Sequence, residues 1–141
     1  SFGSLFFGNE VSPMKMLAED IKNGNFKTAY LFCGEEAYLR NQYKNRLAQA
    51  LCDPSDTMNF SRFEGKNIIP AEGISLADTL PFFAERRLIL IEDSGFFKNK
   101  CDELADYLPK MPDTTCIIFV ETEADKRNRL YKAVQKQGRF I

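Results

Sequence analysis

The apolar residues of this chain change their spacing repeatedly, and each change marks the boundary of an expected element. Apolar residues three or four positions apart predict amphipathic helices, whereas short continuous or alternating apolar runs predict strands. The expected helices cover residues 13–23, 36–52, 70–80, 99–108 and 126–136. The expected strands cover residues 28–33, 58–63, 87–91 and 115–120, and a fifth strand begins at residue 139.

The expected strands are of two kinds. Residues 28–33, 87–91 and 115–120 are continuously apolar, which is typical of strands covered on both faces. Residues 58–63 alternate imperfectly with polar residues, as a strand near a sheet edge does. Strands that alternate with helices indicate right-handed crossovers between parallel strands. The pattern therefore predicts an α/β domain with a doubly wound, mostly parallel, five-stranded sheet.

The length of 141 residues suits a single domain. Residues 13–141 are expected to form this domain, and residues 1–12 are expected to be a tag remnant or a flexible N-terminus. Because the last strand has only begun where the sequence stops, we expect the chain to be a fragment of a longer protein.

Composition excludes several classes of function. Lys and Arg total 19 and Asp and Glu total 20, so the net charge is −1. A chain with this charge is not attracted to nucleic acid or to an anionic membrane. No apolar stretch approaches the roughly 20 residues of a membrane span. Histidine is absent, which removes catalytic triads and proton relays that depend on it. The four cysteines form no CxxC pair, so a reduced, cytoplasmic protein without a metal site is expected.

A glycine follows the first apolar strand, at the place where many α/β folds bind a nucleotide. A P-loop has the pattern GxxxxGK[ST], but this register would put leucine at the second glycine, arginine at the lysine and asparagine at the hydroxyl residue. Two glutamates also place negative charge where phosphates would lie. We therefore expect no bound nucleotide and no cofactor. The degenerate P-loop position comprises Gly34, Glu35, Glu36, Leu39, Arg40 and Asn41.

Acidic residues follow several of the apolar strands. These residues are Glu35, Glu36, Glu92, Asp93 and Glu121. They are expected to gather at the carboxyl edge of the sheet, where such clusters can bind magnesium. An alternative function is therefore a magnesium-dependent phosphoryl-transfer or phospho-acceptor domain that uses Glu35, Glu92 and Asp93. Acidic residues also suit the first turn of a helix, and this interpretation is favoured.

The stretch TLPFFAERR joins the third helix to the third strand. Its apolar residues, at positions 80–83, are either ordinary core or an anchor displayed to a partner, and their spacing does not decide between these alternatives. Pro81 prevents the helix from continuing smoothly through them. Arg86 and Arg87 are expected either to support this loop or its contact, or to be solvated charges at the start of the strand.

Four stretches in order resemble the N-terminal domain of the bacterial DNA polymerase III delta subunit family. They are AYLFCGEEAYLRNQ, FSRFEGKN, TLPFFAERRLILIED and DKRNRLYKAVQKQGRFI, and together the resemblance covers about residues 13–141. The resemblance implies an AAA+-like P-loop NTPase fold with a degenerate nucleotide site. The small helical lid and the helical collar domains of the family would follow and are absent from this fragment.

The resemblance also implies a function. Members of this family bind the ring-shaped β sliding clamp and open it, so that ATPase partners can load the ring onto primed DNA. The family's clamp-binding residues fall on Leu80, Pro81, Phe82 and Phe83, although phenylalanine replaces a frequent leucine and the spacer is a proline. The implied partners are the clamp and, through the full-length protein, the gamma/tau and delta-prime subunits, with DNA contacted only indirectly. The holoenzyme is a DNA-directed DNA polymerase, a nucleotidyltransferase, but this domain is expected to be non-catalytic.

Overall fold

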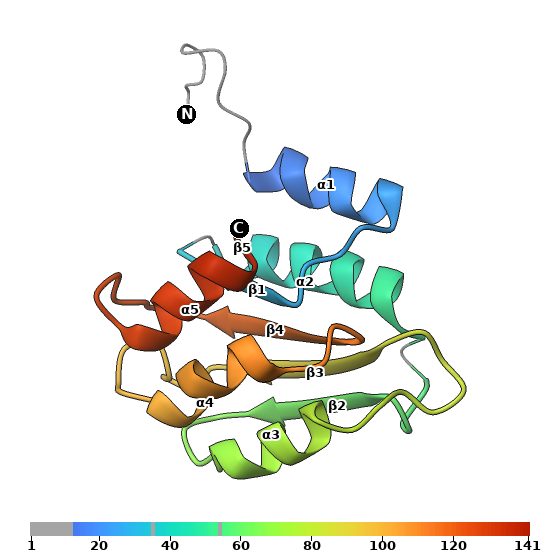
Figure 1. Ribbon diagram of the computed structural model, residues 1–141. Coiled ribbons are helices and arrows are strands. Elements are labelled where there is room, and N and C mark those ends of the chain that lie inside the picture. Colours follow the sequence, from blue (N-terminus) through green and yellow to red (C-terminus); the bar gives the residue numbers. More distant parts are fainter. Residues whose placement is uncertain (1–12, 35, 54) are drawn as a thin grey trace.

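The computed structural model describes residues 13–34, 36–53 and 55–141, so the expected tag or flexible segment at residues 1–12 lies outside the described part (Figure 1). The strands are β1 (Ala29–Cys33), β2 (Phe60–Glu64), β3 (Arg87–Glu92), β4 (Thr115–Glu121) and β5 (Arg139–Phe140). The α-helices are α1 (Pro13–Asn23), α2 (Ala37–Leu51), α3 (Pro70–Ala77), α4 (Asp102–Tyr107) and α5 (Arg129–Gln137). A 3₁₀ turn, η2 (Leu108–Lys110), follows α4.

The strands form one sheet in the order β2-β3-β4-β1-β5, and every pairing is parallel. The continuously apolar strands β3, β4 and β1 occupy the centre, whereas β2 is an edge strand, as its alternating pattern predicted. Four strands have five to seven residues, but β5 contributes only two and pairs with β1 alone. The predicted parallel α/β architecture is thus confirmed, but in place of a full fifth strand the sheet has a two-residue extension.

Helices cover both faces of the sheet (Figure 1). One core cluster joins inward residues of α3, α4 and α5 to Ile89, Ile117 and Phe119. The other joins α1 and α2 to Leu88 and Ile118 on the opposite face. Successive residues of a strand point to opposite faces, so each central strand supplies both cores. Burial on both faces explains why these strands are apolar without alternation.

Two predicted helices begin later than their apolar spacing indicated. The helix α5 begins at Arg129 rather than at residue 126, because the side chain of Asn128 accepts hydrogen bonds from the amides of Leu130 and Tyr131 and caps the helix there. The helix α4 begins at Asp102 rather than at residue 99. Apolar spacing locates the buried face of a helix, and in α5 a side-chain cap sets where the helix begins.

Gly138 ends α5, as expected, but for a different reason than a left-handed cap. Its φ of −149° is extended, and a Cβ atom built on it would overlap the carbonyl oxygen of Ala29 in β1. Glycine is needed at this position because the chain passes directly over the neighbouring strand.

Replacing Gly138 with alanine is therefore expected to detach β5 while the rest of the sheet stays folded. The amide of Ile141 donates to the carbonyl of Leu31 at 2.8 Å in the wild type, and its protection from hydrogen exchange should be lost. Gly73→Ala is the matched control, since nothing lies within 4 Å of its Cβ position in α3, and it should leave Ile141 protected. Protection of Ile141 in Gly138→Ala at the wild-type level would contradict this assignment.

The four cysteines are not in disulfides, and Cys52, Cys101 and Cys116 are buried. Within the described ranges, no helix is both long and apolar enough to span a bilayer.

Candidate functional site

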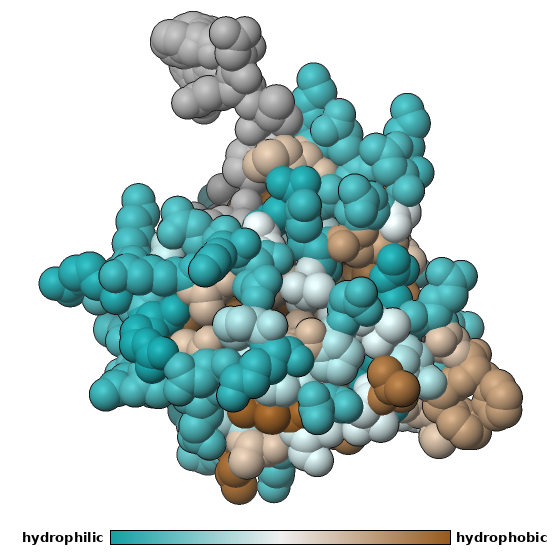
Figure 2. Space-filling view, viewed as in Figure 1, coloured by the Kyte–Doolittle hydropathy of each residue, from teal (hydrophilic) through white to brown (hydrophobic). Residues whose placement is uncertain are grey.

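The connection between α3 and β3 presents three large apolar side chains to solvent. Leu80, Phe82 and Phe83 are 66%, 51% and 95% exposed. Figure 2 shows a hydrophobic projection at the lower right, where Figure 1 places this connection. Single exposed apolar residues are common, but three within four positions form a patch typical of a binding surface. The structure thus places these three side chains outside the core, and their binding to a partner stays a prediction.

This segment, hereafter the 80–83 loop, begins two residues after the C-cap of α3 at Asp78. The Thr79 hydroxyl donates to the carbonyl of Ser75 at 3.0 Å and so closes the last turn of the helix. Phe83 has a φ of 52°, a left-handed conformation that is uncommon for a residue other than glycine. Its ring meets that of Phe82 edge to face, with the centroids 4.5 Å apart. The two rings therefore form one compact apolar projection.

A buried asparagine outside the loop holds Phe82. Asn59 precedes β2 and is only 1% exposed. Its Oδ1 accepts the Phe82 amide at 2.7 Å, and its Nδ2 donates to the Phe82 carbonyl at 2.8 Å and to Oδ2 of Asp56 at 2.8 Å. Both backbone polar groups of Phe82 are thus bonded to one side chain.

A buried arginine holds the start of the same loop. The guanidinium of Arg87 donates to the carbonyls of Thr79, Met58 and Leu80 at 3.0, 3.1 and 3.3 Å, and the residue is 5% exposed. It is therefore not a solvated charge. Arg86 is half-buried and lies over the ring of Phe26, 4.7 Å from its centroid.

Asn59 and Asp56 were not predicted from the sequence. Asp56 accepts the amides of Met58 and Asn59 through Oδ1, a local turn that an Asp before a strand could have indicated. The contact from Asn59 to Phe82 spans 23 residues, and no local pattern announces it.

The glycine after β1 lies in a short turn. Gly34 has a φ of 84°, and α2 already begins at Ala37. Leu39, Arg40 and Asn41 lie inside that helix, and Glu36 precedes it without a side-chain cap. Glu35 lies outside the described residues. That this turn binds no nucleotide stays a prediction.

The acidic residues at the carboxyl edge have separate partners. Glu92 receives Lys44 Nζ at 3.1 Å and Arg62 Nη2 at 2.7 Å. Glu121 accepts the Ser94 hydroxyl at 2.7 Å and the amides of Ser94 and Gly95, and burial raises the pKa of its carboxyl. Asp93 is exposed with a φ of 55°.

No group of three or more Cys, Asp or Glu side chains suited to a metal ion occurs among the described residues. The magnesium alternative therefore gains no support from this part of the chain.

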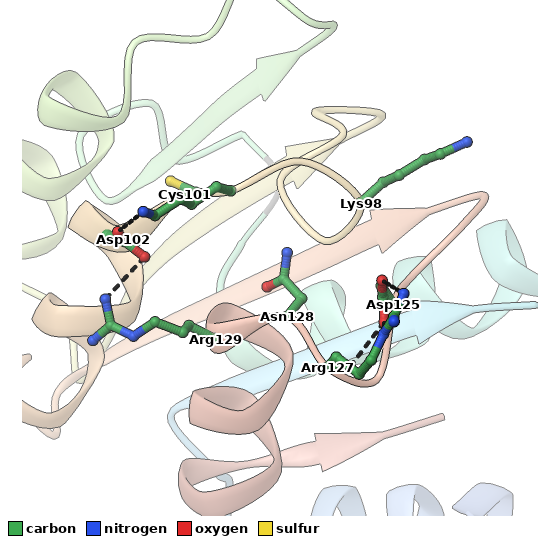
Figure 3. A pocket seen from close by; sticks show the side chains of 8 residues that line it. Lys98, Cys101, Asp102, Asp125, Arg127, Asn128 and Arg129 are labelled. Carbon is green, nitrogen blue, oxygen red and sulfur yellow. Dashed lines mark hydrogen bonds and ion pairs between the residues drawn. The ribbon is translucent and has the colours of Figure 1, made fainter.

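A second concave region lies between the N-terminal ends of α4 and α5 (Figure 3). It is a pocket of about 410 Å³ whose cationic side chains are paired. Lys100 and Arg129 contact Asp102, and Arg127 contacts Asp125. Because each of these three cations already has a carboxylate partner, the 80–83 loop is the stronger candidate.

Two comparisons with known sequences point to the same family. Residues 30–141 match the sequence model of the family described as DNA polymerase III, delta subunit. The DNA polymerase III subunit delta of Bacillus subtilis (strain 168) is 28% identical over 132 residues, which cover 85% of this chain and 38% of that protein.

Two solved structures are similar in fold. The DNA clamp loader delta protein of Bacillus subtilis has a TM-score of 0.78 and 23% identity, covering 89% of this chain and 41% of that one. A DNA polymerase III gamma subunit-related protein from Thermotoga maritima has a TM-score of 0.60 and 13% identity, covering 92% of this chain and 45% of that one. The chain thus spans about two-fifths of the length of its delta relatives.

Proposed function

Because this chain belongs to the DNA polymerase III delta subunit family, we propose that it is the part of a clamp-loader subunit that binds the β sliding clamp through the 80–83 loop. The single observation that carries the proposal is the exposure of Leu80, Phe82 and Phe83. They lie on a loop whose backbone carbonyls accept hydrogen bonds from the buried side chains of Asn59 and Arg87. The domain itself is non-catalytic in this proposal. ATP hydrolysis belongs to the gamma/tau partners, which the full-length protein meets together with delta-prime.

The proposed contact is a hydrophobic anchor that enters a pocket of the clamp. Apolar surface removed from water contributes about 25 cal/mol per Å², so burying two phenylalanines and a leucine supplies several kcal/mol before association costs. Large aromatic side chains that become fully desolvated are the usual hot spots of protein interfaces. Pro81, between Leu80 and the rings, restricts the backbone conformations of the anchor.

Ring opening needs no chemistry from this domain. A ligand shifts a conformational equilibrium only by the difference between its affinities for the two states. If the loop binds the clamp more tightly when an interface of the ring is open, binding favours the open ring. The primed DNA is then reached through the opened clamp rather than through a basic surface of this domain, whose net charge is −1.

Calorimetric titration tests the proposal against the phosphoryl-transfer alternative. Titrating the domain with its sliding clamp is expected to give saturable heat, with a negative heat-capacity change from burial of apolar surface. Titration with Mg²⁺ and ATP is expected to give none. Absence of clamp binding would contradict the proposal, whereas magnesium-dependent heat that Asp93→Asn abolishes would favour the alternative.

A further inference from the structure

Two buried polar side chains hold the exposed loop, although neither belongs to it. Asn59 lies before β2 and Arg87 begins β3, so the bases of two paired strands fix the backbone that carries the apolar side chains. An exposed loop does not require such support to keep the domain folded. The hydrogen bonds from Asn59 and Arg87 to the loop therefore need an explanation other than the stability of the domain.

Both polar atoms of the Asn59 side chain are hydrogen-bonded. Its carboxamide has one acceptor and two donor hydrogens, and these meet the Phe82 amide, the Phe82 carbonyl and the Asp56 carboxylate. Bonding both backbone groups of Phe82 fixes the peptide planes on either side of that residue. The ring directions of Phe82 and of the following Phe83 are constrained as a result.

Arg87 couples the loop to Asn59. Its guanidinium joins the carbonyls of Thr79 and Leu80 to the carbonyl of Met58, the residue before Asn59. A planar guanidinium holds several acceptors in fixed directions, which a lysine ammonium does not. The beginning and the middle of the loop are therefore tied to the same turn.

Order of this kind changes the cost of binding. A free loop loses about 1–2 kcal/mol of backbone entropy for each residue that a partner orders, and a loop held in its bound conformation avoids that loss. The left-handed φ of Phe83 also indicates that the loop is held in one conformation, since such a backbone conformation persists only where the surrounding structure imposes it.

We infer that Asn59 and Arg87 are positioning residues that hold Leu80, Phe82 and Phe83 in the clamp-binding conformation before the clamp arrives. The inference rests on the proposed function. It assigns a role in recognition to two residues that do not themselves form the apolar surface.

Hydrogen exchange and clamp affinity, measured on the same variants, test this inference. In the free wild type, the Phe82 amide is expected to be protected, although its side chain is half exposed. Asn59→Ala should abolish that protection and weaken clamp binding about 10-fold, the factor expected from restoring disorder to one residue. Arg87→Lys should act in the same direction and supplies the comparison if Asn59→Ala fails to fold.

Tyr30→Phe is the matched control for a purely structural effect. It removes a buried hydroxyl of β1 that donates to Asp20 of α1 at 2.9 Å. It should lower thermal stability while leaving both Phe82 protection and clamp affinity unchanged. Unchanged affinity in Asn59→Ala and Arg87→Lys, with an unprotected Phe82 amide, would overturn the inference and leave the clamp site standing. Failure of the wild type to bind the clamp would remove both.

Discussion

A chain that carries Leu80→Ser, Phe82→Ser and Phe83→Ser is expected to lose at least about 100-fold in affinity for the sliding clamp, because the triple change removes the whole apolar anchor. Its Tm should stay within a few degrees of the wild type, since the three side chains are mostly exposed and substitutions of exposed residues usually change stability little. Calorimetric or anisotropy titration gives the affinity, and circular dichroism gives the Tm.

Ile69→Ser is the matched control for this variant. Ile69 is 54% exposed and lies before the first turn of α3, at the opposite end of the helix from the 80–83 loop. Losing an exposed apolar side chain there should leave clamp affinity unchanged. A triple variant that binds as tightly as the wild type would refute the assignment of the site. Equal losses in both variants would indicate nonspecific hydrophobic association.

Glu92→Ala is expected to lower the free energy of unfolding by about 3–5 kcal/mol. Glu92, at the end of β3, receives the ammonium of Lys44 from α2 at 3.1 Å, and the two side chains are only 9% and 10% exposed. Without the carboxylate, the Lys44 charge stays buried with no opposite charge to offset its lost hydration. Urea denaturation of the two proteins measures the difference.

Two further variants separate charge burial from loss of the side chain itself. Arg62→Ala removes the other partner of Glu92. Because the Arg62 side chain is 58% exposed, this change should lower the free energy of unfolding by no more than about 1 kcal/mol. The double variant Lys44→Met, Glu92→Leu replaces the buried pair with apolar groups and should recover most of the loss. If the double variant is as unstable as Glu92→Ala, the unpaired charge is not the cause.

Local pattern was enough for the order and type of the elements. The three continuously apolar strands proved to be the three central strands, and the alternating one proved to be the edge. A strand that is buried on both faces is continuously apolar, whereas a strand that is buried on one face alternates, so the spacing of apolar residues indicates the position of the strand. Boundaries were less accurate, because single side chains such as Asn128 place a helix end through hydrogen bonds that apolar spacing does not record.

The candidate site was located by the sequence only with the help of family resemblance. The pattern around residues 80–83 left core and display open, and it gave Arg87 three possible roles. Asn59 was not considered at all. Its bonds to Phe82 depend on the parallel pairing of β2 with β3, which brings residues 23 positions apart into contact.

Two Phe-Phe pairs show where local information ends. Phe96 and Phe97 follow β3 and are 9% and 0% exposed, and Phe97 packs edge to face on Phe119 with the centroids 4.8 Å apart. Phe82 and Phe83 precede the same strand and project into solvent. A charged residue follows each pair within two positions, so local composition does not distinguish them. The tertiary structure distinguishes them, because Phe96 and Phe97 pack in the core with residues of α4 and α5. Phe82 and Phe83 lie instead on an exposed loop whose backbone is hydrogen-bonded to Asn59 and Arg87.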